Sequence, residues 1–385
     1  MPGLLPAIDP DGLLEYSVVF TDRALNHMSQ KFQRVMRDIA GVLKEVYRAP
    51  TAIIVPGSGS FGMEAVARQF ATGRKTLVIR NGWFSYRWTQ IFEMGGIPSE
   101  QLVLMARRHL SGSEARFAPF APAPIDEVVA TIRAERPAVV FAPHVETSAG
   151  LLLPDDYLRA VADAAHEVGA LFVLDCIASG ALWVDMQSTG VDVLISAPQK
   201  GWSGSPCCAF VMLSDLARQQ LDATTSSSFA MDLKKWLQIM QAYENGGHAY
   251  HATMPTDALT LCRDAMLETR DYGFERLRQE QLTLGLKVRA LLEDRGFASV
   301  AAPGFQAPGV VVSYTTHDGL HTGKAFIAEG VQSAAGVPLQ CDEGPDFKTF
   351  RIGLFGLDKL HAPERSVASL ARALDHILAT ETATV

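Results

Sequence analysis

The segment VDVLISAPQK, residues 191–200, predicts a short buried strand that runs into a loop and carries a lysine at its end. Its apolar and β-branched residues favour a strand, and the Gly, Ser and Pro residues after Lys200 favour a loop. A lysine just past a buried strand is partly desolvated, and desolvation disfavours the charged form of an amine. We therefore expect Lys200 to be a nucleophilic amine that is able to form a Schiff base with a carbonyl group.

The segment ALFVLD, residues 170–175, has the same pattern and places an aspartate at the end of a second buried strand. Taken alone, Asp175 is also compatible with a helix cap or a metal ligand, and Lys200 with a solvated loop lysine. A lysine and an aspartate at neighbouring strand ends match what pyridoxal 5′-phosphate needs, because the lysine holds the aldehyde and the aspartate pairs with the pyridinium nitrogen. Because both residues stand at the ends of buried strands, a cofactor site is favoured over the simpler alternatives for each residue alone.

Short apolar segments alternate with segments of helical periodicity over the first part of the chain. Continuous apolar strands between helices indicate a mostly parallel sheet covered on both faces, and ligands bind such sheets at the carboxyl ends of the strands. The sequence therefore predicts an α/β fold. The expected strands are residues 52–55, 76–79, 138–142, 170–175, 191–196 and 209–213, and the expected helices are 28–47, 63–70, 86–92 and 154–168.

Beyond about Pro255 the pattern changes to that of a smaller α+β domain. Its expected elements are a long helix over 258–295, strands at 309–313 and 349–353, and a closing amphipathic helix over 362–378. A chain of 385 residues exceeds the size at which single cores stop growing, so two domains are expected. We predict an N-terminal arm over 1–22, a large domain over 23–257 and a small domain over 258–385.

Composition argues against several classes of function. A net charge of −8 without a basic cluster argues against nucleic acid as a partner, and no stretch reaches the roughly 18 consecutive apolar residues of a membrane span. The five cysteines show neither a CxxC pair nor Cys/His ligand spacing, so we expect a reducing compartment and no metal site. Neither end of the sequence reads as a targeting signal, and we expect a cytoplasmic protein.

The segment GSGSFG, residues 57–62, follows a predicted strand, precedes a predicted helix and matches G-x-G-x-x-G. This motif alone would suggest dinucleotide binding, but the next strand ends in Arg80 rather than in an acid for a ribose hydroxyl. An arginine there is compatible with a 2′-phosphate, so the dinucleotide interpretation stays open, as does a turn without a ligand. We favour a cradle for a phosphate monoester, made at a helix start by the amide groups of Ser58, Gly59 and Ser60.

These segments together resemble the class V aminotransferases of the fold-type I pyridoxal-phosphate enzymes, and most of all the alanine–glyoxylate and serine–glyoxylate aminotransferases. The most specific match is SAPQK, residues 196–200, a strand end with glutamine before the lysine, and the likeness runs from about Phe32 to Leu378. The resemblance implies a large domain with a mostly parallel seven-stranded sheet flanked by helices, and a smaller C-terminal α+β domain. It also implies pyridoxal 5′-phosphate as the cofactor.

The resemblance implies a role for each residue expected around the cofactor ring. Lys200 would form the Schiff base and later move the substrate proton, and Asp175 would keep the pyridine nitrogen protonated. Ile177 would pack on one face of the ring and Phe84, in the segment NGWFSYR, on the other face. Trp83 is a more conspicuous aromatic, but the register of the segment favours Phe84, and each of these apolar residues would otherwise be a core residue.

The resemblance also implies contacts with the cofactor's substituents and with the substrate. The Thr147 hydroxyl, in the segment ETSAG, would lie near the O3′ atom, and Gln199 would contact the phosphate. Tyr250 and Thr253 match a Tyr-x-x-Thr pair that reaches the phosphate of the neighbouring subunit, which implies a homodimer with shared active sites. Arg351 matches the arginine that binds the substrate carboxylate as a bidentate fork.

The implied reaction moves an amino group from a small amino acid to a 2-oxo acid such as glyoxylate or pyruvate by a ping-pong mechanism. Another pyridoxal-phosphate reaction (lyase, desulfurase-like or racemase) stays open, as does a non-catalytic protein that binds the cofactor. Cys341 lies on a loop before Arg351, as the persulfide cysteine of some desulfurases does, but Gln199 stands where desulfurases usually have a histidine. The segment 9–16 departs from the family's Gly-Pro-rich opening, which leaves the substrate open.

Overall fold

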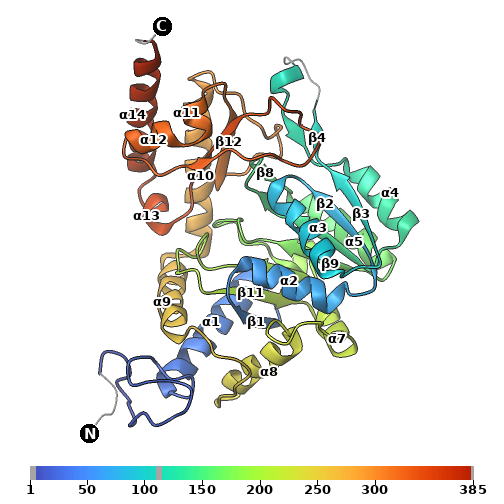
Figure 1. Ribbon diagram of the computed structural model, residues 1–385, viewed down its shortest axis with the longest axis vertical. Helices are drawn as coiled ribbons and strands as arrows, with labels where there is room; N and C mark the ends of the chain where they lie inside the picture. Colours follow the sequence, from blue (N-terminus) through green and yellow to red (C-terminus); the bar gives the residue numbers. More distant parts are fainter. Residues whose placement is uncertain (1–5, 110–114, 383–385) are drawn as a thin grey trace.

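A seven-stranded sheet forms the centre of the larger part of the molecule (Figure 1). The computed structural model describes residues 6–109 and 115–382. Every strand of this sheet runs in one direction except β11, which is antiparallel to both of its neighbours. The predicted α/β fold with a mostly parallel seven-stranded sheet is confirmed. In spatial order the strands are β1 (Thr51–Pro56), β11 (Cys208–Leu213), β10 (Val193–Ser196), β9 (Leu171–Asp175), β6 (Val139–Pro143), β2 (Lys75–Arg80) and β3 (Glu100–Met105).

The sequence did not predict β3, which lies at the edge of the sheet beside β2. Its first residue is exposed and the other five are partly buried, so its sequence, EQLVLM, lacks the fully apolar character of the inner strands. Inner strands such as β6 and β9 are buried along their whole length, and their apolar runs predicted them correctly.

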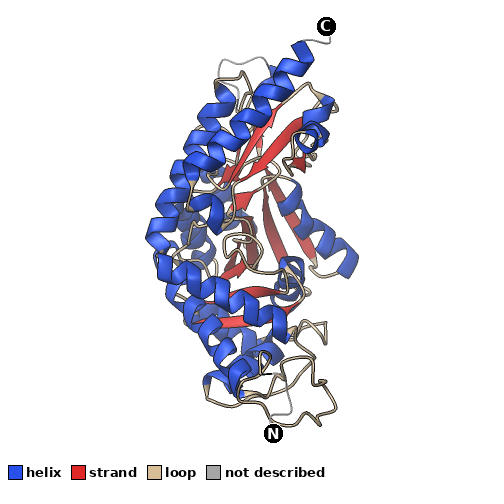
Figure 2. Cartoon of the chain, turned by 90° about the vertical axis from the view of Figure 1, so that its left-hand side faces the viewer, coloured by secondary structure: helices blue, strands red, loops and turns tan. Residues whose placement is uncertain are grey.

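Helices cover the sheet on both sides (Figure 2). Helix α2 begins at Gly59 and not at Met63 as predicted. The segment of residues 57–62, called the glycine loop below, therefore supplies the first turn of this helix. Helix α3 likewise begins at Trp83, three residues before the predicted start at Tyr86. The helices of this part of the chain are α1 (Gln30–Tyr47), α2 (Gly59–Phe70), α3 (Trp83–Gly95), α4 (Ile125–Glu135), α5 (Asp155–Glu167), α6 (Met186–Thr189), α7 (Asp215–Ala223), α8 (Leu233–Glu244) and α9 (Thr256–Tyr272).

Aromatic packing fixes α3 on the sheet. The fully buried rings of Trp88 and Phe92, on α3, lie with their centroids 4.5 Å and 5.2 Å from that of Phe141, on β6. Aromatic pairs at such distances add to the stabilisation that burial itself gives. The first turn of α3, which carries Phe84, is therefore held on a rigid support.

The smaller domain combines a short antiparallel sheet with two long helices, as Figure 1 shows at the C-terminal end of the molecule. Its strand order is β12-β14-β13, and β13 was not predicted because two residues give no readable alternation. The elements of this domain are α10 (Phe274–Glu293), β12 (Val310–Tyr314), α11 (Asp318–His321), α12 (Lys324–Ala328), β13 (Ala334–Ala335), β14 (Thr349–Gly353), α13 (Leu357–Leu360) and α14 (Pro363–Thr382).

The continuous helix predicted over 258–295 is wrong, because the chain breaks at Gly273 into α9 and α10. Gly273 has φ 107 and ψ 120, a backbone conformation outside the helical region that glycine adopts without steric cost. Helical periodicity continues on both sides of this residue, so the pattern of apolar residues did not reveal the break. The apolar side chains of α9 pack into the core of the large domain, and those of α10 into the core of the small one.

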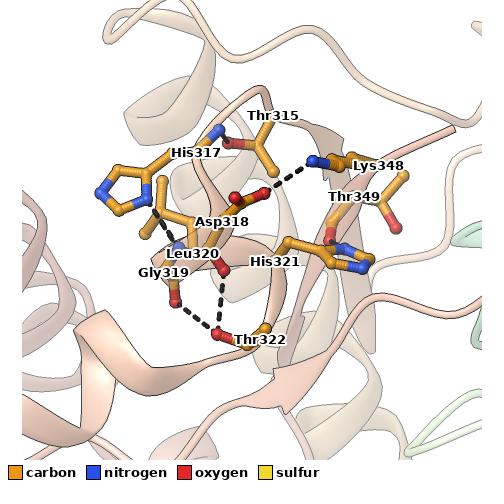
Figure 3. Close-up of polar contacts among 9 residues, drawn as sticks. All are labelled: Thr315, His317, Asp318, Gly319, Leu320, His321, Thr322, Lys348 and Thr349. Carbon is orange, nitrogen blue, oxygen red and sulfur yellow. Dashed lines mark hydrogen bonds and ion pairs between the residues drawn. The ribbon is translucent and has the colours of Figure 1, made fainter. Parts of the chain in front are cut away.

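Figure 3 shows how polar contacts hold α11 against β14. The Nδ1 atom of His317 caps the helix by accepting a hydrogen bond of 2.8 Å from the amide of Gly319. His321 donates from Nδ1 to the carbonyl oxygen of Thr349 at 2.8 Å, and Lys348 pairs with Asp318 at 2.6 Å. These contacts fasten α11 to the start of β14, the strand that carries Arg351.

A third apolar cluster joins the two domains. It contains Val145 and Leu151 from the β7–β8 hairpin together with Val310 and Val312 from β12. The amide of Ala307 also donates to the carbonyl oxygen of Gly150, in the turn of this hairpin, at 2.8 Å. The short elements around this cluster are β4 (Arg107–Arg108), η1 (Ala115–Phe117), β5 (Phe120–Ala121), β7 (Val145–Glu146) and β8 (Leu151–Leu152).

The division into an arm, a large domain and a small domain stays a proposal, and the change of core at Gly273 suggests a boundary there. Residues 1–5 and 383–385, to which the expectations about targeting signals refer, lie outside the described residues. Within residues 6–109 and 115–382, no helix combines the length and the apolar character that crossing a bilayer requires.

Two helical glycines test how tightly α2 packs on the sheet. A Cβ atom added to Gly62 would overlap the Cβ of Ala209 on β11, whereas one added to Gly41 on α1 would meet no atom within 4 Å. We expect Gly62→Ala to lower stability by about 1–3 kcal/mol through overpacking. We expect Gly41→Ala to raise it by about 0.5–1 kcal/mol through reduced backbone entropy of the unfolded chain. Thermal unfolding followed by circular dichroism measures both, and equal midpoints for the two variants would contradict this packing.

Candidate active site

A cavity of about 190 Å³ lies at the carboxyl ends of the sheet strands. The register explains this position, because Asp175 at the end of β9 stands level with Pro143 of β6 and Ile195 of β10. Nine of the twelve predicted site residues line the cavity, and Tyr250, Thr253 and Arg351 do not. The lining residues are Ser58, Gly59, Ser60, Met63, Phe84, Arg87, Val145, Thr147, Asp175, Ile177, Ala178, Gln199 and Lys200.

The glycine loop presents amide groups to the cavity. Ser58 is the N-cap of α2, and the first amides of a helix have no acceptor within the helix. Ser58 makes no side-chain capping bond, and in the described part of the chain no loop or side-chain acceptor engages the amides of Ser58, Gly59 and Ser60. A Cβ atom at Gly59 would lie 2.6 Å from Cδ1 of Ile177, so the glycine allows Ile177 to pack directly against the loop. The result is an amide cradle with an aliphatic wall beside it.

The Asp175 carboxylate is buried at the base of the cavity, with 8% of the residue exposed. Burial raises its pKa to about 6, although the amide of Ile177 donates to Oδ1 at 2.9 Å. Glu146 raises this pKa further, and the positive charges of Arg87 and Lys200 lower it. A carboxylate with such a pKa gains most from a cationic partner inside the cavity.

The Lys200 amine is partly buried and makes no hydrogen bond with any of the described residues. Its Nζ atom lies 5.2 Å from the ring centroid of Phe355. Burial lowers the pKa of Lys200, and the charge of Arg351 lowers it further, against the opposing effect of Asp175. A lower pKa makes the amine easier to deprotonate, and its partial burial agrees with the position just past a buried strand.

A fully buried glutamate, Glu146, holds the first turn of α3 beside the cavity. Its carboxylate accepts hydrogen bonds from the amides of Phe84 and Ser85 at 3.2 Å and 2.9 Å, and from the hydroxyl of Ser85 at 2.8 Å. It also accepts from the amide and hydroxyl of Ser148, whose oxygen in turn accepts from the amide of Trp83. A carboxylate at a helix N-terminus is favoured by the helix dipole as well. This network positions Phe84 at the cavity wall.

Arg351 lies beside the same aromatic ring, although it does not line the cavity. It is partly buried on β14, and its guanidinium carbon lies 5.6 Å from the ring centroid of Phe84. Its Nε donates to the carbonyl oxygen of Ala335 at 2.7 Å, and in the described part of the chain its terminal nitrogens contact no carboxylate within 4 Å. Burial lowers the pKa of Arg351, and Glu146 raises it. The guanidinium is thus oriented and free to bind an anion.

Three contributors to the site were not recognised in the sequence. Arg87 lines the cavity and follows Phe84 by one helical turn, a spacing that the segment NGWFSYR already contains. Glu146 belongs to the recognised segment ETSAG, but its role depends on α3, which is distant in sequence. The ring of Phe355 faces Lys200 from a loop of the small domain, and no local pattern in the sequence indicates this contact.

Tyr250 and Thr253 lie away from the cavity of their own chain, in the loop between α8 and α9. Tyr250 is 52% exposed, and its hydroxyl lies 3.1 Å from that of Thr253. Its ring centroid lies 5.5 Å from that of His27, which is itself buried. Any contribution of this pair to an active site would therefore be made to another chain.

Cys341 and His144 do not have the character of reactive groups. The Cys341 thiol donates to the carbonyl oxygens of Arg80 and Leu339 at 3.6 Å and 3.7 Å, and burial raises its pKa to about 12. The Nδ1 of His144 is 2.7 Å from the hydroxyl of Ser179, and burial lowers the pKa of this histidine to about 3. A thiol that stays protonated is a poor nucleophile, which argues against desulfurase-like chemistry.

Comparison with known proteins identifies the family. The sequence profile described as aminotransferase class-V matches residues 13–337. A 2-aminoethylphosphonate–pyruvate transaminase from Burkholderia ambifaria is 30% identical over 335 residues, which cover 83% of this chain and 81% of the relative. An alanine–glyoxylate aminotransferase from Rattus norvegicus is 24% identical over 368 residues, which cover 92% of this chain and 83% of the relative.

Solved structures share the fold. An alanine–glyoxylate aminotransferase from Nostoc sp. superposes with a TM-score of 0.75 at 22% identity, covering 91% of this chain and 88% of that one. An aspartate aminotransferase of subgroup IV from Thermus thermophilus superposes with a TM-score of 0.73 at 24% identity, covering 92% of this chain and 94% of that one. The seven-stranded sheet and the small C-terminal domain are thus those of the fold-type I enzymes.

Replacement of the buried glutamate tests whether it organises the cavity wall. In Glu146→Gln the amide nitrogen cannot accept, so at least one of the donors on Phe84, Ser85 or Ser148 loses its partner. We expect a loss of about 2–3 kcal/mol in stability, measured as a lower midpoint of urea unfolding. The control is Glu93→Gln, an exposed position on the same helix, which should change stability by less than about 0.5 kcal/mol. A Glu146→Gln midpoint equal to that of the control would refute this role.

Proposed function

We propose a cofactor and a reaction for this chain from one premise: the chain belongs to the aminotransferase class-V family and is an aminotransferase. The proposed cofactor is pyridoxal 5′-phosphate, bound in the cavity at the end of β9 and β10. The proposed reaction moves an amino group from a small amino donor with an anionic group to a 2-oxo acid, glyoxylate or pyruvate, by a ping-pong mechanism. The observation that carries the proposal is the partly buried, unbonded amine of Lys200 in one cavity with the buried carboxylate of Asp175.

The lining of the cavity fits this cofactor. The open amides of Ser58, Gly59 and Ser60 suit a phosphate group, and the carboxylate of Asp175, whose pKa burial raises, suits a protonated ring nitrogen. The side chains of Ile177 and Phe84 offer the aliphatic and aromatic surfaces that a flat ring needs. Gln199 and Thr147 add polar groups at the same cavity, in support of the contacts proposed for the phosphate and for O3′.

When bound, pyridoxal 5′-phosphate supplies an aldehyde that receives the amino group and a ring that stores an electron pair. Lys200 would hold the cofactor covalently and, once a donor has displaced it, would remove the proton from the donor's Cα atom. Asp175 would keep the ring nitrogen protonated. Its charge would also favour the protonated form of Lys200 at the moment when the lysine carries the proton.

Arg351 would bind the anionic group of the donor and of the acceptor. Its terminal nitrogens form a fork that suits a carboxylate or a phosphonate, and its Nε is already fixed by Ala335. The relatives include alanine–glyoxylate aminotransferases and 2-aminoethylphosphonate–pyruvate transaminases, so alanine and 2-aminoethylphosphonate are the two donors to compare first. Serine and aspartate are further small donors compatible with the same anchor.

A homodimer with shared active sites is the proposed assembly. In support, Tyr250 is exposed with a hydroxyl pair that does not reach its own cavity, and apolar side chains on the N-terminal arm are also uncovered. The exposed apolar residues of the arm are Leu13, Leu14, Tyr16 and Val18. The five free thiols favour a reducing compartment, and we place the enzyme in the cytoplasm; its recovery from a secreted fraction of the source cells would contradict this placement.

The lysine and the donor are tested together by half-reactions. Purified enzyme with pyridoxal 5′-phosphate should convert alanine or 2-aminoethylphosphonate to its oxo product once per active site without an acceptor. With an acceptor the conversion should repeat, using glyoxylate for alanine, and glyoxylate or pyruvate for 2-aminoethylphosphonate. Lys200→Ala should lower turnover by at least roughly 10²–10⁴-fold, because it removes the residue that transfers the proton. After borohydride reduction, mass spectrometry should find the cofactor on Lys200 of the wild type.

The control is Lys287→Ala, an exposed lysine of α10, which should keep full activity. Full turnover in Lys200→Ala would refute the role of this lysine. Failure of every small donor, in an enzyme that binds the cofactor covalently, would refute the proposed donor class.

Hybrid dimers test the shared site. A chain with Lys200→Ala and a chain with Tyr250→Ala and Thr253→Val are each expected to form homodimers of low activity. If Tyr250 and Thr253 serve the partner subunit, a hybrid of the two chains contains one intact site and should recover about half of the wild-type activity per dimer. A hybrid no more active than the mixture of the two homodimers would rule out a shared site.

A further inference from the structure

Arg87 occupies a place between the glycine loop and the aromatic wall of the cavity. It lies on α3 one turn after Phe84, and its Nη1 donates to the hydroxyl oxygen of Ser60 at 3.0 Å. Its guanidinium carbon lies 5.3 Å from the ring centroid of Phe84. The side chain thus joins the first turn of α2 to α3, two elements that build the cavity from different parts of the sequence.

The guanidinium of Arg87 has no acidic partner. Among residues 6–109 and 115–382, no carboxylate oxygen lies within 4 Å of it, whereas Arg68 and Arg133, for example, each pair with a glutamate. In the described part of the chain, Ser60 is the one acceptor that engages any of its five N–H groups. The unused N–H groups of a partly buried guanidinium are costly to leave without an acceptor, and Arg87 lines a cavity in which a ligand could supply one.

Charge balance identifies the anion. A phosphate monoester carries about −1.5 to −2 charges near neutral pH. The segment of residues 56–62 that forms the cradle contains no lysine or arginine, and its amides and the α2 dipole supply only partial charges. Gln199 is neutral, and Lys200 is engaged at the aldehyde end of the proposed cofactor. Arg87 is therefore the cation of this chain that stands next to the cradle.

We propose that Arg87 is a further binding residue for the cofactor phosphate. It would place one full positive charge beside the phosphate, where the amides supply only partial charges, and it orients the Ser60 hydroxyl. Since the Ser60 oxygen accepts from Arg87, its own proton remains available to donate to a phosphate oxygen. This inference rests on the proposed function, because it assumes pyridoxal 5′-phosphate in this cavity. Arg351 serves a different end of the site, since its Nε is bonded to Ala335 of β13 in the small domain.

A second explanation of the same contacts is that Arg87 only supports Phe84. Both explanations predict that its loss weakens cofactor binding, but they differ in which part of the cofactor matters. Support of Phe84 acts on the ring, which pyridoxal and pyridoxal 5′-phosphate share. A contact with the phosphate acts on pyridoxal 5′-phosphate alone. Comparing the two ligands on one set of variants therefore separates the explanations.

The experiment measures dissociation constants of pyridoxal 5′-phosphate and of pyridoxal for the full-length chain after removal of bound cofactor, by absorbance titration without any amino donor. Arg87→Met should weaken binding of pyridoxal 5′-phosphate by about 10- to 100-fold, the range expected for a charge-assisted hydrogen bond, and that of pyridoxal by less than about 3-fold. Arg87→Lys should recover part of the loss because it restores the charge. Arg133→Met, which removes an exposed surface charge, should bind both ligands as the wild type does.

Inorganic phosphate gives an independent readout. It should compete with pyridoxal 5′-phosphate on the wild type and much less on Arg87→Met, and added salt should weaken binding more in the wild type than in this variant. Equal losses for pyridoxal and pyridoxal 5′-phosphate in Arg87→Met, or no loss for either, would overturn the inference while leaving the proposed function intact. A wild-type chain that binds no pyridoxal 5′-phosphate would overturn both.

Discussion

The buried carboxylate of Glu146 is the constraint on which the active-site geometry depends. A fully buried charge is tolerated only when hydrogen bonds satisfy it, and here three amides and two hydroxyl groups do so. These donors belong to the first turn of α3 and to the turn after β7, so one side chain fixes both segments. Because Phe84 and Arg87 lie on α3, the position of this helix determines where both side chains stand in the cavity. The turn after β7 packs on β12 of the small domain. Since β12 pairs with β14, this packing also brings Arg351 close to the Phe84 ring.

Burial has opposite effects on the two ionisable groups at the strand ends. It raises the pKa of the Asp175 carboxyl to about 6 and lowers the pKa of the Lys200 amine. Both shifts favour the neutral form, and each leaves the group ready for a partner that restores or uses its charge. A cationic ring nitrogen would stabilise ionised Asp175, and an electrophilic carbon would take the lone pair of Lys200. The sheet thus prepares both groups by the same physical means, the exclusion of water from the strand ends.

The parts of this arrangement that are local in sequence could be predicted, and the parts that depend on packing could not. The strand ends at Asp175 and Lys200 are preceded by continuous apolar runs, which is why the fold and these two residues were accessible from the sequence. The break at Gly273 escaped prediction because apolar periodicity continues through it, and the edge strand β3 because its side chains are half exposed. The contacts of Glu146 and Arg87 join segments that are far apart in sequence, so no pattern within one segment indicates them.

Two arginines lie beside the Phe84 ring, and under the proposals made above each would bind a different anion. The guanidinium carbons of Arg87 and Arg351 lie 5.3 Å and 5.6 Å from the Phe84 centroid, but they are held by different elements. Ser60, in the first turn of α2 in the large domain, fixes Arg87, and Ala335, on the sheet of the small domain, fixes Arg351. A movement of the small domain would therefore shift Arg351 and leave Arg87 in place. Under the proposals made above, a substrate anion would be exchanged in each half of the ping-pong cycle while the phosphate stays bound at the glycine loop.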